Sequence, residues 1–337
     1  MGSHYSVGEN TVLKMSPPNP KSLPAPLRGA MQAGETRNPK FESGAALLLA
    51  LWALFLLSAL VIAWALEIDS RLTISGIANR RFEAEALACS GAEVAMHPDV
   101  QPGSPNLSRK IDNRKSYQVQ MTGEGGRLNL NWLIAGEDPT RLGILRRYLT
   151  NKGIDINELN RMVDCLLDWV DPDDLERLNG AEASDDYRPP NHLLTRVDEL
   201  KQIKGWEDFT SRPGWEDDFT LSSSGPVDLA WASRDVLLAL PGMTEGLVDR
   251  FLQFRRGPDG LDGTNDDAPY QNLDDVRAAL GFSPQQFSQI AGLVIFRDAV
   301  FRIVSVGRSG EATRVVRMVI RRPTNVSVPQ VISWKEL

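Results

Sequence analysis

The sequence predicts an α+β protein in which a long N-terminal α-helix packs on a small antiparallel sheet, with a large helical domain inserted into that sheet. Three observations predict this fold. A long, uncharged apolar run near the N-terminus continues into a helical pattern. Apolar and polar residues alternate at Tyr117–Met121 and again near the C-terminus, whereas the segment between them has mainly helical periodicity. The sheet can close around so long an insertion because the cost of closing a loop grows only logarithmically with its length.

The apolar run, residues 45–66, is predicted to be a transmembrane helix. It contains 22 residues without a charge, and at about 1.5 Å per residue such a helix spans roughly the 30 Å hydrocarbon core of a bilayer. Arg37 and Lys40 precede the run, and Glu67 and Asp69 follow it. Because positive residues favour the cytoplasmic side, we expect a single-pass protein whose N-terminus is cytoplasmic and whose larger part lies across the membrane.

Two ordinary explanations of this run compete with a more specific one given below. A secretory signal peptide has a core of only about 7–15 apolar residues followed by a cleavage site of small residues. The run is longer than that, and Trp64-Ala65-Leu66-Glu67 is a poor site of this kind. A plain signal anchor remains an alternative. The polar stretch of residues 1–44 is rich in Pro, Ser, Gly and Asn and has no apolar period, so we expect it to be disordered.

Beyond the apolar run, the helical pattern continues until Pro98, which disfavours helix in the residue before it. The whole helix is therefore predicted to cover residues 45–97, with its second half packed on a soluble domain. Segments 98–126 and 297–325 are predicted to form the sheet whose apolar face covers that second half.

The C-terminal part is predicted to be a β-hairpin, and the insertion is predicted to be helical. The hairpin strands are Val300–Val306 and Thr313–Ile320, joined by a turn at Gly307–Gly310. Six stretches of the insertion have one apolar face at helical spacing. These are Arg141–Leu149, Ile156–Val170, Arg196–Ile203, Ser233–Phe254, Leu273–Leu280 and Pro284–Phe296.

Charge is unevenly distributed along the chain, whose formal net charge is −7. Residues 155–218 include 18 acidic and 7 basic residues, and residues 299–337 include 7 basic and 2 acidic ones. An acidic middle segment argues against a surface that follows nucleic-acid phosphates and leaves room for a cation or a basic partner. Leu240–Gly246 is similar to a helix-hairpin-helix turn, but the acidic residues Glu245 and Asp249 beside it favour a structural junction over DNA binding.

Two acidic segments are candidates for calcium, which takes six to eight oxygen ligands in flexible geometry. The ligand candidates of the first are Asp168, Asp171, Asp173, Asp174, Glu182 and Asp185, with Asn179 and Asp186 close in sequence. Those of the second, a glycine-rich stretch, are Asp259, Asp262, Asn265 and Asp267. Neither has the spacing of an EF-hand. Carboxylates that cap helices and turns, or that lie in a flexible surface loop, are the alternative explanation.

Other chemistry is weakly indicated. Cys89 and Cys165 could pair in an oxidising compartment or remain as separate thiols, and three scattered histidines do not suggest zinc. No Gly-x-Ser-x-Gly element and no phosphate-binding loop is present in the sequence. We therefore expect a protein that is not an enzyme. A membrane-anchored, metal-dependent hydrolase built on the acidic clusters is the alternative from the enzyme class.

The N-terminal region resembles that of type IV pilins and pseudopilins, in which a basic leader ends in Gly directly before an apolar helix. The resemblance implies that a prepilin peptidase cleaves between Gly44 and Ala45 and that Ala45 becomes N-methylated. Residues 1–44 would then be the leader, and translation starting at Met31 would give one of 14 residues. Most pilins carry Glu at the fifth mature position, where this chain has Leu49.

Four further elements resemble one family, the type II secretion minor pseudopilin protein K, which usually lacks that glutamate. They are Gly123–Asn131 (GEGGRLNLN), Leu167–Asp174 (LDWVDPDD) followed by Asn179–Glu182, Asp198–Gly205 (DELKQIKG) and Leu237–Met243 (LLALPGM). One element departs from the family's pattern, since Asp228–Ser233 (DLAWAS) replaces an Asn-hydrophobic-Asn-Thr-Ala-Pro stretch.

This resemblance implies a pilin-like body with an inserted helical domain of two sterile-alpha-motif-like halves, residues 127–220 and 221–296. It implies a subunit at the tip of the pseudopilus that initiates assembly and supports export across the outer membrane. The implied partners are pseudopilins I and J, with H and the major pseudopilin G below, the prepilin peptidase and the inner-membrane assembly platform. Calcium in the soluble domain and a place in the bacterial inner membrane, with the soluble domain periplasmic, are also implied. A minor pilin or tip adhesin of a type IV pilus is the alternative.

The leucine at the fifth mature position has a physical interpretation within this family. In pilins the glutamate is thought to neutralise the amino terminus of the neighbouring subunit, which avoids a charge buried in lipid. A subunit at the tip has no neighbour above it and would not need that carboxylate. We hypothesise that Leu49 marks such a position, so that Leu49→Glu should leave tip assembly intact.

Overall fold

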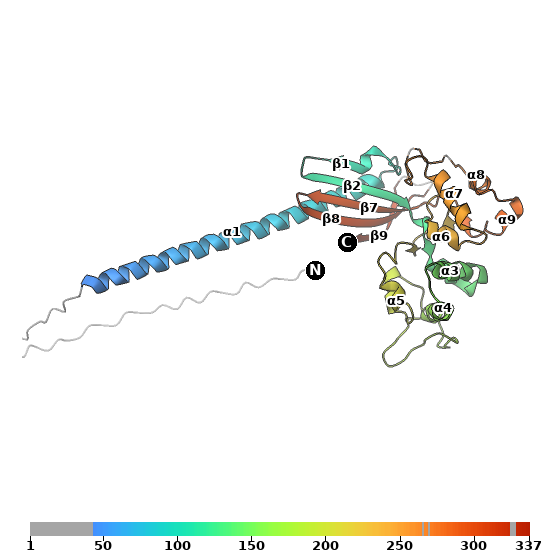
Figure 1. Cartoon of the computed structure of the whole chain (residues 1–337), viewed down its shortest axis with the longest axis horizontal. Coiled ribbons are helices and arrows are strands. Elements are labelled where there is room, and N and C mark those ends of the chain that lie inside the picture. Colours follow the sequence, from blue (N-terminus) through green and yellow to red (C-terminus); the bar gives the residue numbers. More distant parts are fainter. Residues whose placement is uncertain (1–42, 265, 269, 324–327) are drawn as a thin grey trace, which may run out of the picture. The chain divides into compact units, whose positions relative to one another are not determined.

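A computed structural model describes residues 43–264, 266–268, 270–323 and 328–337 (Figure 1). The chain divides into two compact units, Met1–Leu66 and Glu67–Leu337. Helix α1 (Ser43–Met96) begins in the first unit and ends in the second. It starts two residues earlier than predicted, so Gly44 and Ala45 lie in its first turn. The predicted leader, including Met31, lies outside the described residues except for its last two positions.

The first unit is the apolar part of α1. This helix is long and apolar enough to cross a membrane, judged by length and composition. Its large apolar side chains are exposed along the whole run, and Leu49, for example, is 71% exposed. A helix with apolar side chains on all sides satisfies its own backbone groups and is suited to lipid. The unit therefore has the character of a single-pass membrane anchor.

The second unit contains one antiparallel sheet of five strands in the order β1-β2-β7-β8-β9 (Figure 1). The strands are β1 (Ser108–Lys110), β2 (Lys115–Gly123), β7 (Val300–Ser309), β8 (Ala312–Arg321) and β9 (Gln330–Glu336). Strands β2 and β7 pair in register, Val119 opposite Ser305, although the whole helical insertion separates them in sequence. The predicted α+β fold is confirmed. The two outer strands, β1 and β9, were not predicted because their residues do not alternate clearly.

The hairpin turn lies three residues later than predicted. Strand β7 continues through Gly307 to Ser309, and the chain reverses at Gly310 and Glu311. Gly310 has φ +59°, in the left-handed region that glycine adopts readily. Gly307 lies within the strand, and α1 passes so near that a Cβ atom at Gly307 would lie 2.0 Å from the carbonyl oxygen of Ala84.

Small side chains let the second half of α1 approach the sheet closely. Ala84, Ala88, Ala92 and Ala95 are fully buried at helical spacing. The core between helix and sheet also contains Val100, Leu107, Tyr117, Val119, Met121, Ile303, Val316, Met318 and Ile320. The guanidinium group of Arg322 donates hydrogen bonds to the carbonyl oxygens of Ala95, His97 and Val100. A cation thus satisfies carbonyl groups at the C-terminal end of α1, where the helix dipole favours it.

The insertion runs from η2 (Glu124–Gly126) to β6 (Val294–Ile295) and is largely helical. Its helices are α2 (Leu130–Ile134), α3 (Pro139–Asn151), α4 (Ile156–Val170), α5 (Glu207–Thr210), α6 (Arg234–Ala239), α7 (Glu245–Arg255), α8 (Leu273–Leu280) and α9 (Pro284–Ser288), with 3-10 turns η3 (Ala135–Glu137) and η4 (Val197–Gln202). A further turn, η1 (Pro105–Leu107), precedes β1. Two short parallel pairs join β3 (Leu128–Asn129) to β4 (Phe219–Thr220) and β5 (Val227–Asp228) to β6.

Three predicted helices differ from the structure. The stretch Ser233–Phe254 is two helices, because the chain turns at Pro241-Gly242 and Gly242 has φ +76°. Arg196–Ile203 forms a 3-10 turn, and Pro284–Phe296 is a short helix followed by β6. In each case the spacing of apolar residues that predicts a helix also fits the shorter elements that the structure has.

One hydrophobic core runs through the whole insertion, from Leu128 to Val294. Hydrogen bonds also cross the predicted boundary at residues 220 and 221: Arg147 Nη1 donates to the carbonyl oxygen of Ala239 at 3.0 Å, and Ser233 Oγ donates to Asp218 at 2.7 Å. The two halves of the insertion therefore pack as one body and do not have separate cores.

Candidate functional sites: the domain junction and the acidic cluster

The chain leaves the sheet at Gly123–Arg127, and a buried ion pair secures this exit. Glu124 is 1% exposed, and Arg302 of β7 donates to both of its oxygens at 2.7 Å. Thr220 also donates to Glu124, from the far end of the first half of the insertion. A bidentate guanidinium–carboxylate pair of this kind fixes geometry as well as charge. Through Glu124, the hydrogen bonds connect η2 to the sheet at Arg302 and to the insertion at Thr220.

Arg127 adds a second guanidinium group to this pair. Its Nη1 donates to Glu124 at 3.3 Å, and its Nε donates to the carbonyl oxygen of Asp217 at 2.9 Å. Burial, followed by the like charge of Arg302, lowers the pKa of Arg127 to about 10. The guanidinium group remains protonated at neutral pH.

The glycines of this segment are required by close packing. A Cβ atom at Gly123 or Gly126 would lie within 2.1 to 2.5 Å of Trp231. A Cβ atom at Gly125 would meet Asp298 at 2.8 Å and Asp228 at 3.1 Å. The Gly-Glu-Gly-Gly element is therefore a place where two segments of backbone cross with no room for a side chain.

Asp228 secures the return of the chain to the sheet. Its fully buried carboxylate accepts hydrogen bonds from the backbone N–H groups of Ala230, Arg297 and Asp298 at 2.8 to 3.0 Å. Burial raises the pKa of Asp228, and these three hydrogen bonds oppose that shift. Arg297 has φ +64°, an uncommon conformation for a residue with a side chain. Asp228 lies in the segment that departs from the family pattern, yet it organises this crossing.

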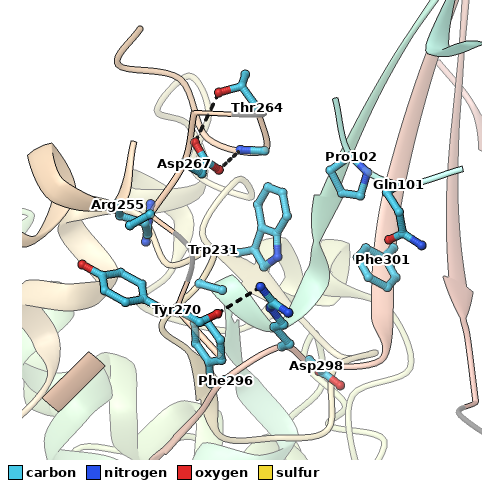
Figure 2. Close-up of a pocket in the computed structure, with 14 residues that line it drawn as sticks. Gln101, Pro102, Trp231, Arg255, Thr264, Asp267, Tyr270, Phe296, Asp298 and Phe301 are labelled. Atoms are coloured by element: carbon cyan, nitrogen blue, oxygen red, sulfur yellow. Dashed lines mark hydrogen bonds between the residues drawn. The ribbon is translucent and has the colours of Figure 1, made fainter. Parts of the chain in front are cut away.

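A cavity of about 510 Å³ lies beside the junction (Figure 2). Gln101, Pro102 and Phe301 line it from the sheet side, and Trp231 and Tyr270 line it from the insertion. Some of the polar groups that line the cavity already form hydrogen bonds within the protein. For example, Asp267 accepts from the N–H of Gly263 at 2.7 Å and from Thr264 Oγ1 at 3.3 Å. The cavity separates two packed bodies, and its lining favours no single ligand.

The second candidate calcium segment is held by its own contacts. Asp262 accepts from Nε of Arg255 at 2.9 Å and from Nε of Arg256 at 3.0 Å. Asp259 accepts from the N–H of Leu261, and Asp267 accepts as described above. Asn265 lies outside the described residues. Among the residues that the structure describes, these carboxylates do not converge into one group.

Part of the first candidate segment does converge. Asp168, which is fully buried at the end of α4, lies with Asp171 and Glu182 so that one carboxylate oxygen of each is within 4.8 Å of the others. Asp173, Asp174 and Asp185 are outside this group. Asp173 accepts from the N–H of Leu175, and Asp174 accepts from the side chain of Asn191. We call Asp168, Asp171 and Glu182 the acidic cluster.

Arg177 neutralises part of the acidic cluster. Its Nη1 contacts Asp168 at 2.5 Å and also contacts Asp171, while its Nη2 contacts Glu137 at 2.8 Å. Both carboxylate oxygens of Glu182 and Oδ1 of Asp171 are buried without a partner. Burial, followed by the charges of Asp168 and Asp171, raises the pKa of Glu182. Buried carboxylate oxygens without a hydrogen-bond donor are the kind of ligand that a hard cation takes.

The cysteines lie in different environments. Both are free thiols, with Cys165 buried in α4 and Cys89 partly buried in α1. Burial raises the pKa of Cys165 to about 11, so its thiol is protonated and unreactive at neutral pH.

A long helix packed on a small antiparallel sheet, with a helical domain inserted between β2 and β7, defines a pilin-like fold. The structure is similar to a chain in the GspK-GspI-GspJ complex of the type 2 secretion system of enterotoxigenic Escherichia coli. The TM-score is 0.55 at 12% sequence identity, and the match covers 80% of this chain and 99% of that chain. At this identity, the likeness shows the fold.

The sequence comparisons show which family part of the chain resembles. The family model described as type II secretion system (T2SS), protein K matches residues 126–212. A protein of Escherichia coli K12 assigned as a type II secretion system protein K is 27% identical over 190 residues, which is 49% of this chain and 58% of that protein. The chain thus spans a little over half the length of this curated relative. The chain is therefore similar to the type II secretion system protein K family over residues 126–212.

Proposed function

We propose that the protein is the minor pseudopilin at the tip of a type II secretion pseudopilus, where it initiates assembly and supports export across the outer membrane. The observation that carries this proposal is the combination, in one chain, of an exposed apolar α1 with a pilin-like body interrupted by a large insertion. The apolar half of such a helix can reside in lipid and can then pack inside a filament, whereas the insertion would obstruct a subunit stacked above it.

The proposed partners are counterparts of the subunits named in the similar complex. We infer that the chain binds pseudopilins I and J, with H and the major pseudopilin G below them, and that the assembly platform extracts it from the inner membrane. Its N-terminus would be cytoplasmic and its second unit periplasmic. Affinity purification of this chain from membranes that hold the other minor pseudopilins tests the complex, and failure to recover I and J counterparts would argue against it.

Processing by a prepilin peptidase provides the first prediction. Intact-mass measurement of the membrane-extracted protein should give methylated Ala45–Leu337. Gly44→Leu should retain the leader, because a bulky residue does not fit where the peptidase accepts glycine, and fibre nucleation should be lost. Gly76→Leu is the matched control, since Gly76 lies in the same helix outside the cleavage site. A wild-type mass that retains the leader would return the chain to the plain-anchor class.

We further propose that the acidic cluster binds calcium through Asp168, Asp171 and Glu182. The ion would compensate buried carboxylates that Arg177 leaves only partly neutralised. A ligand at about 100 times its Kd stabilises a fold by about 2.7 kcal/mol, so calcium should raise the melting temperature by about 5–10 °C. Glu182→Gln should abolish this increase, whereas Asp185→Asn, outside the cluster, should retain it. An unchanged midpoint after chelation would remove the calcium proposal.

The raised pKa of Glu182 predicts in which direction Glu182→Gln changes the melting temperature when calcium is absent. Because its folded-state pKa is raised, the carboxylate is disfavoured in the folded protein. Stability therefore falls as the pH rises from the ordinary carboxyl pKa to the raised value, and it stays lower above that value. In chelator at neutral pH, Glu182→Gln should melt at a higher temperature than the wild type. The same substitution is thus stabilising without calcium and neutral or destabilising with it.

A further inference from the structure

The loop that follows α4 exposes leucine side chains to solvent. Leu178 is 97% exposed and Leu175 is 75% exposed, and Leu193, on a neighbouring segment, is 54% exposed. None of the three gains the stabilisation that burying a leucine side chain provides. Apolar surface with a polar rim is characteristic of protein interaction sites. We call Leu175, Leu178 and Leu193 the leucine surface.

The loop is anchored on both sides of Leu178, so the exposure is not a consequence of a loose chain. Before it, Arg177 extends inward to the acidic cluster. After it, Asn179 donates to Asp164 from its backbone N–H at 3.3 Å and from Nδ2 at 2.8 Å. A Cβ atom at Gly180 would lie 1.8 Å from Asp168 Oδ2, which shows how closely the loop lies on α4. Leu178 is therefore held outward between two fixed neighbours.

A second segment, which contains Leu193, contacts this loop through Asn191. Asn191 Nδ2 donates to the carbonyl oxygen of Asp173 and to Asp174 Oδ1, both at 3.3 Å. Asn191 has φ +50°, and Glu137, which pairs with Arg177, has φ +52°. Asn adopts this conformation more readily than most residues, whereas it is uncommon for Glu. Asn191 thus joins its segment to the loop, and Glu137 contacts the residue directly before Leu178.

The rim of the leucine surface is strongly acidic. Residues 171–193 include seven acidic residues and two basic ones. Asp173, Asp174 and Glu176, which flank Leu175, are all exposed. Such a rim attracts a partner with positive charge and repels an anionic lipid surface.

We propose that the leucine surface docks a protein segment in which basic residues flank an apolar side chain. The apolar side chain would cover Leu178, and the basic residues would pair with the exposed carboxylates of the rim. This inference rests on the proposed function and extends it, because it assigns the insertion a partner other than the pilin-like subunits.

Site-specific photo-crosslinking of the full chain in its membrane tests the docking. Leu178→p-benzoylphenylalanine should give an adduct whose mapped peptide, from another protein, carries Lys or Arg beside an apolar residue. Asp173→Asn with Asp174→Asn should lower the adduct yield severalfold. Ile156→p-benzoylphenylalanine is the matched control, because Ile156 is 65% exposed at the start of α4 outside the loop. An adduct with lipid, with a second copy of this chain or with an acidic segment would overturn the proposal.

Export provides a second measurement that separates this inference from the proposed function. Leu178→Ser removes burial worth about 1.5–3 kcal/mol, or roughly tenfold or more in affinity. Export should fall accordingly, while Ile156→Ser exports normally and the complex with I and J is recovered from both variants. Normal export by Leu178→Ser would overturn the docking and leave the proposed function standing. If export continued normally in cells that lack this chain, the proposed function would be overturned. The protein identified in the crosslinked adduct would then still decide whether the leucine surface docks a basic segment.

Discussion

Arg302→Met is expected to lower the free energy of unfolding by about 3–5 kcal/mol, the cost of removing one partner of a buried ion pair. The substitution leaves the carboxylate of Glu124, 1% exposed, without the two hydrogen bonds of 2.7 Å that Arg302 donates. Arg127 at 3.3 Å and Thr220 remain, and neither replaces a bidentate partner. Urea unfolding of the full chain in detergent micelles, followed by near-ultraviolet circular dichroism, measures the change.

Two comparisons show whether burial is the cause. Glu124→Gln combined with Arg302→Met should cost less than the two single substitutions added together, because no buried charge is then left unpaired. Arg317→Met removes a looser pair on β8, in which Arg317 lies 3.7 Å from Glu216 and both side chains are more exposed. Its expected cost is below about 1 kcal/mol. Equal costs for Arg302→Met and Arg317→Met would mean that the buried pair does not secure the junction.

Gly307→Val is expected to detach the second half of α1 from the sheet. A Cβ atom at this position would lie 2.0 Å from the carbonyl oxygen of Ala84 and 2.4 Å from the backbone nitrogen of Ala88. Overpacking a core usually costs about 1–3 kcal/mol when side chains can move. Here the obstacle is helix backbone, so we expect a loss of at least about 3 kcal/mol. Faster hydrogen exchange in β7 and in α1 beyond Leu66 should accompany the loss.

Arg308→Val is the matched control for this substitution. It introduces the same side chain one residue further along β7, where successive side chains point to opposite faces and Arg308 is exposed. It should change the stability by less than about 1 kcal/mol. If Gly307→Val were tolerated equally well, the close approach between α1 and the sheet would not be what holds them together.

Elements whose signals lie within a few neighbouring residues could be predicted from the sequence. Helix α4 begins and ends at the predicted residues, since Asp155 caps its first turn and its apolar face is strongly periodic. Strands β2, β7 and β8 alternate clearly and were predicted. Strand β9 was missed because all seven of its residues are exposed, and β1 was missed because it has only three.

The candidate sites depended on contacts between distant residues. The sequence offered ten possible calcium ligands, and folding brought Asp168, Asp171 and Glu182 together while Asp262 paired with Arg255 and Arg256. The partner of Glu124 lies 178 residues away on β7, and no local pattern could have indicated Arg302. The resemblance to the protein K family pointed to the Gly-Glu-Gly-Gly element, but its packing against Trp231 was visible only in the structure.

The sequence by itself determined that this protein has a lipid-suited N-terminal helix, a sheet interrupted by a helical insertion, and a resemblance to one secretion family. Hydrophobic periodicity, helix caps and glycine-containing motifs are short-range properties, so they can be recognised before the chain is folded. Only the tertiary structure decided which carboxylates lose their water, which acquire a guanidinium partner and which leucines stay exposed. Those outcomes depend on burial and on long-range pairing, and neither exists until the sheet has closed around its insertion.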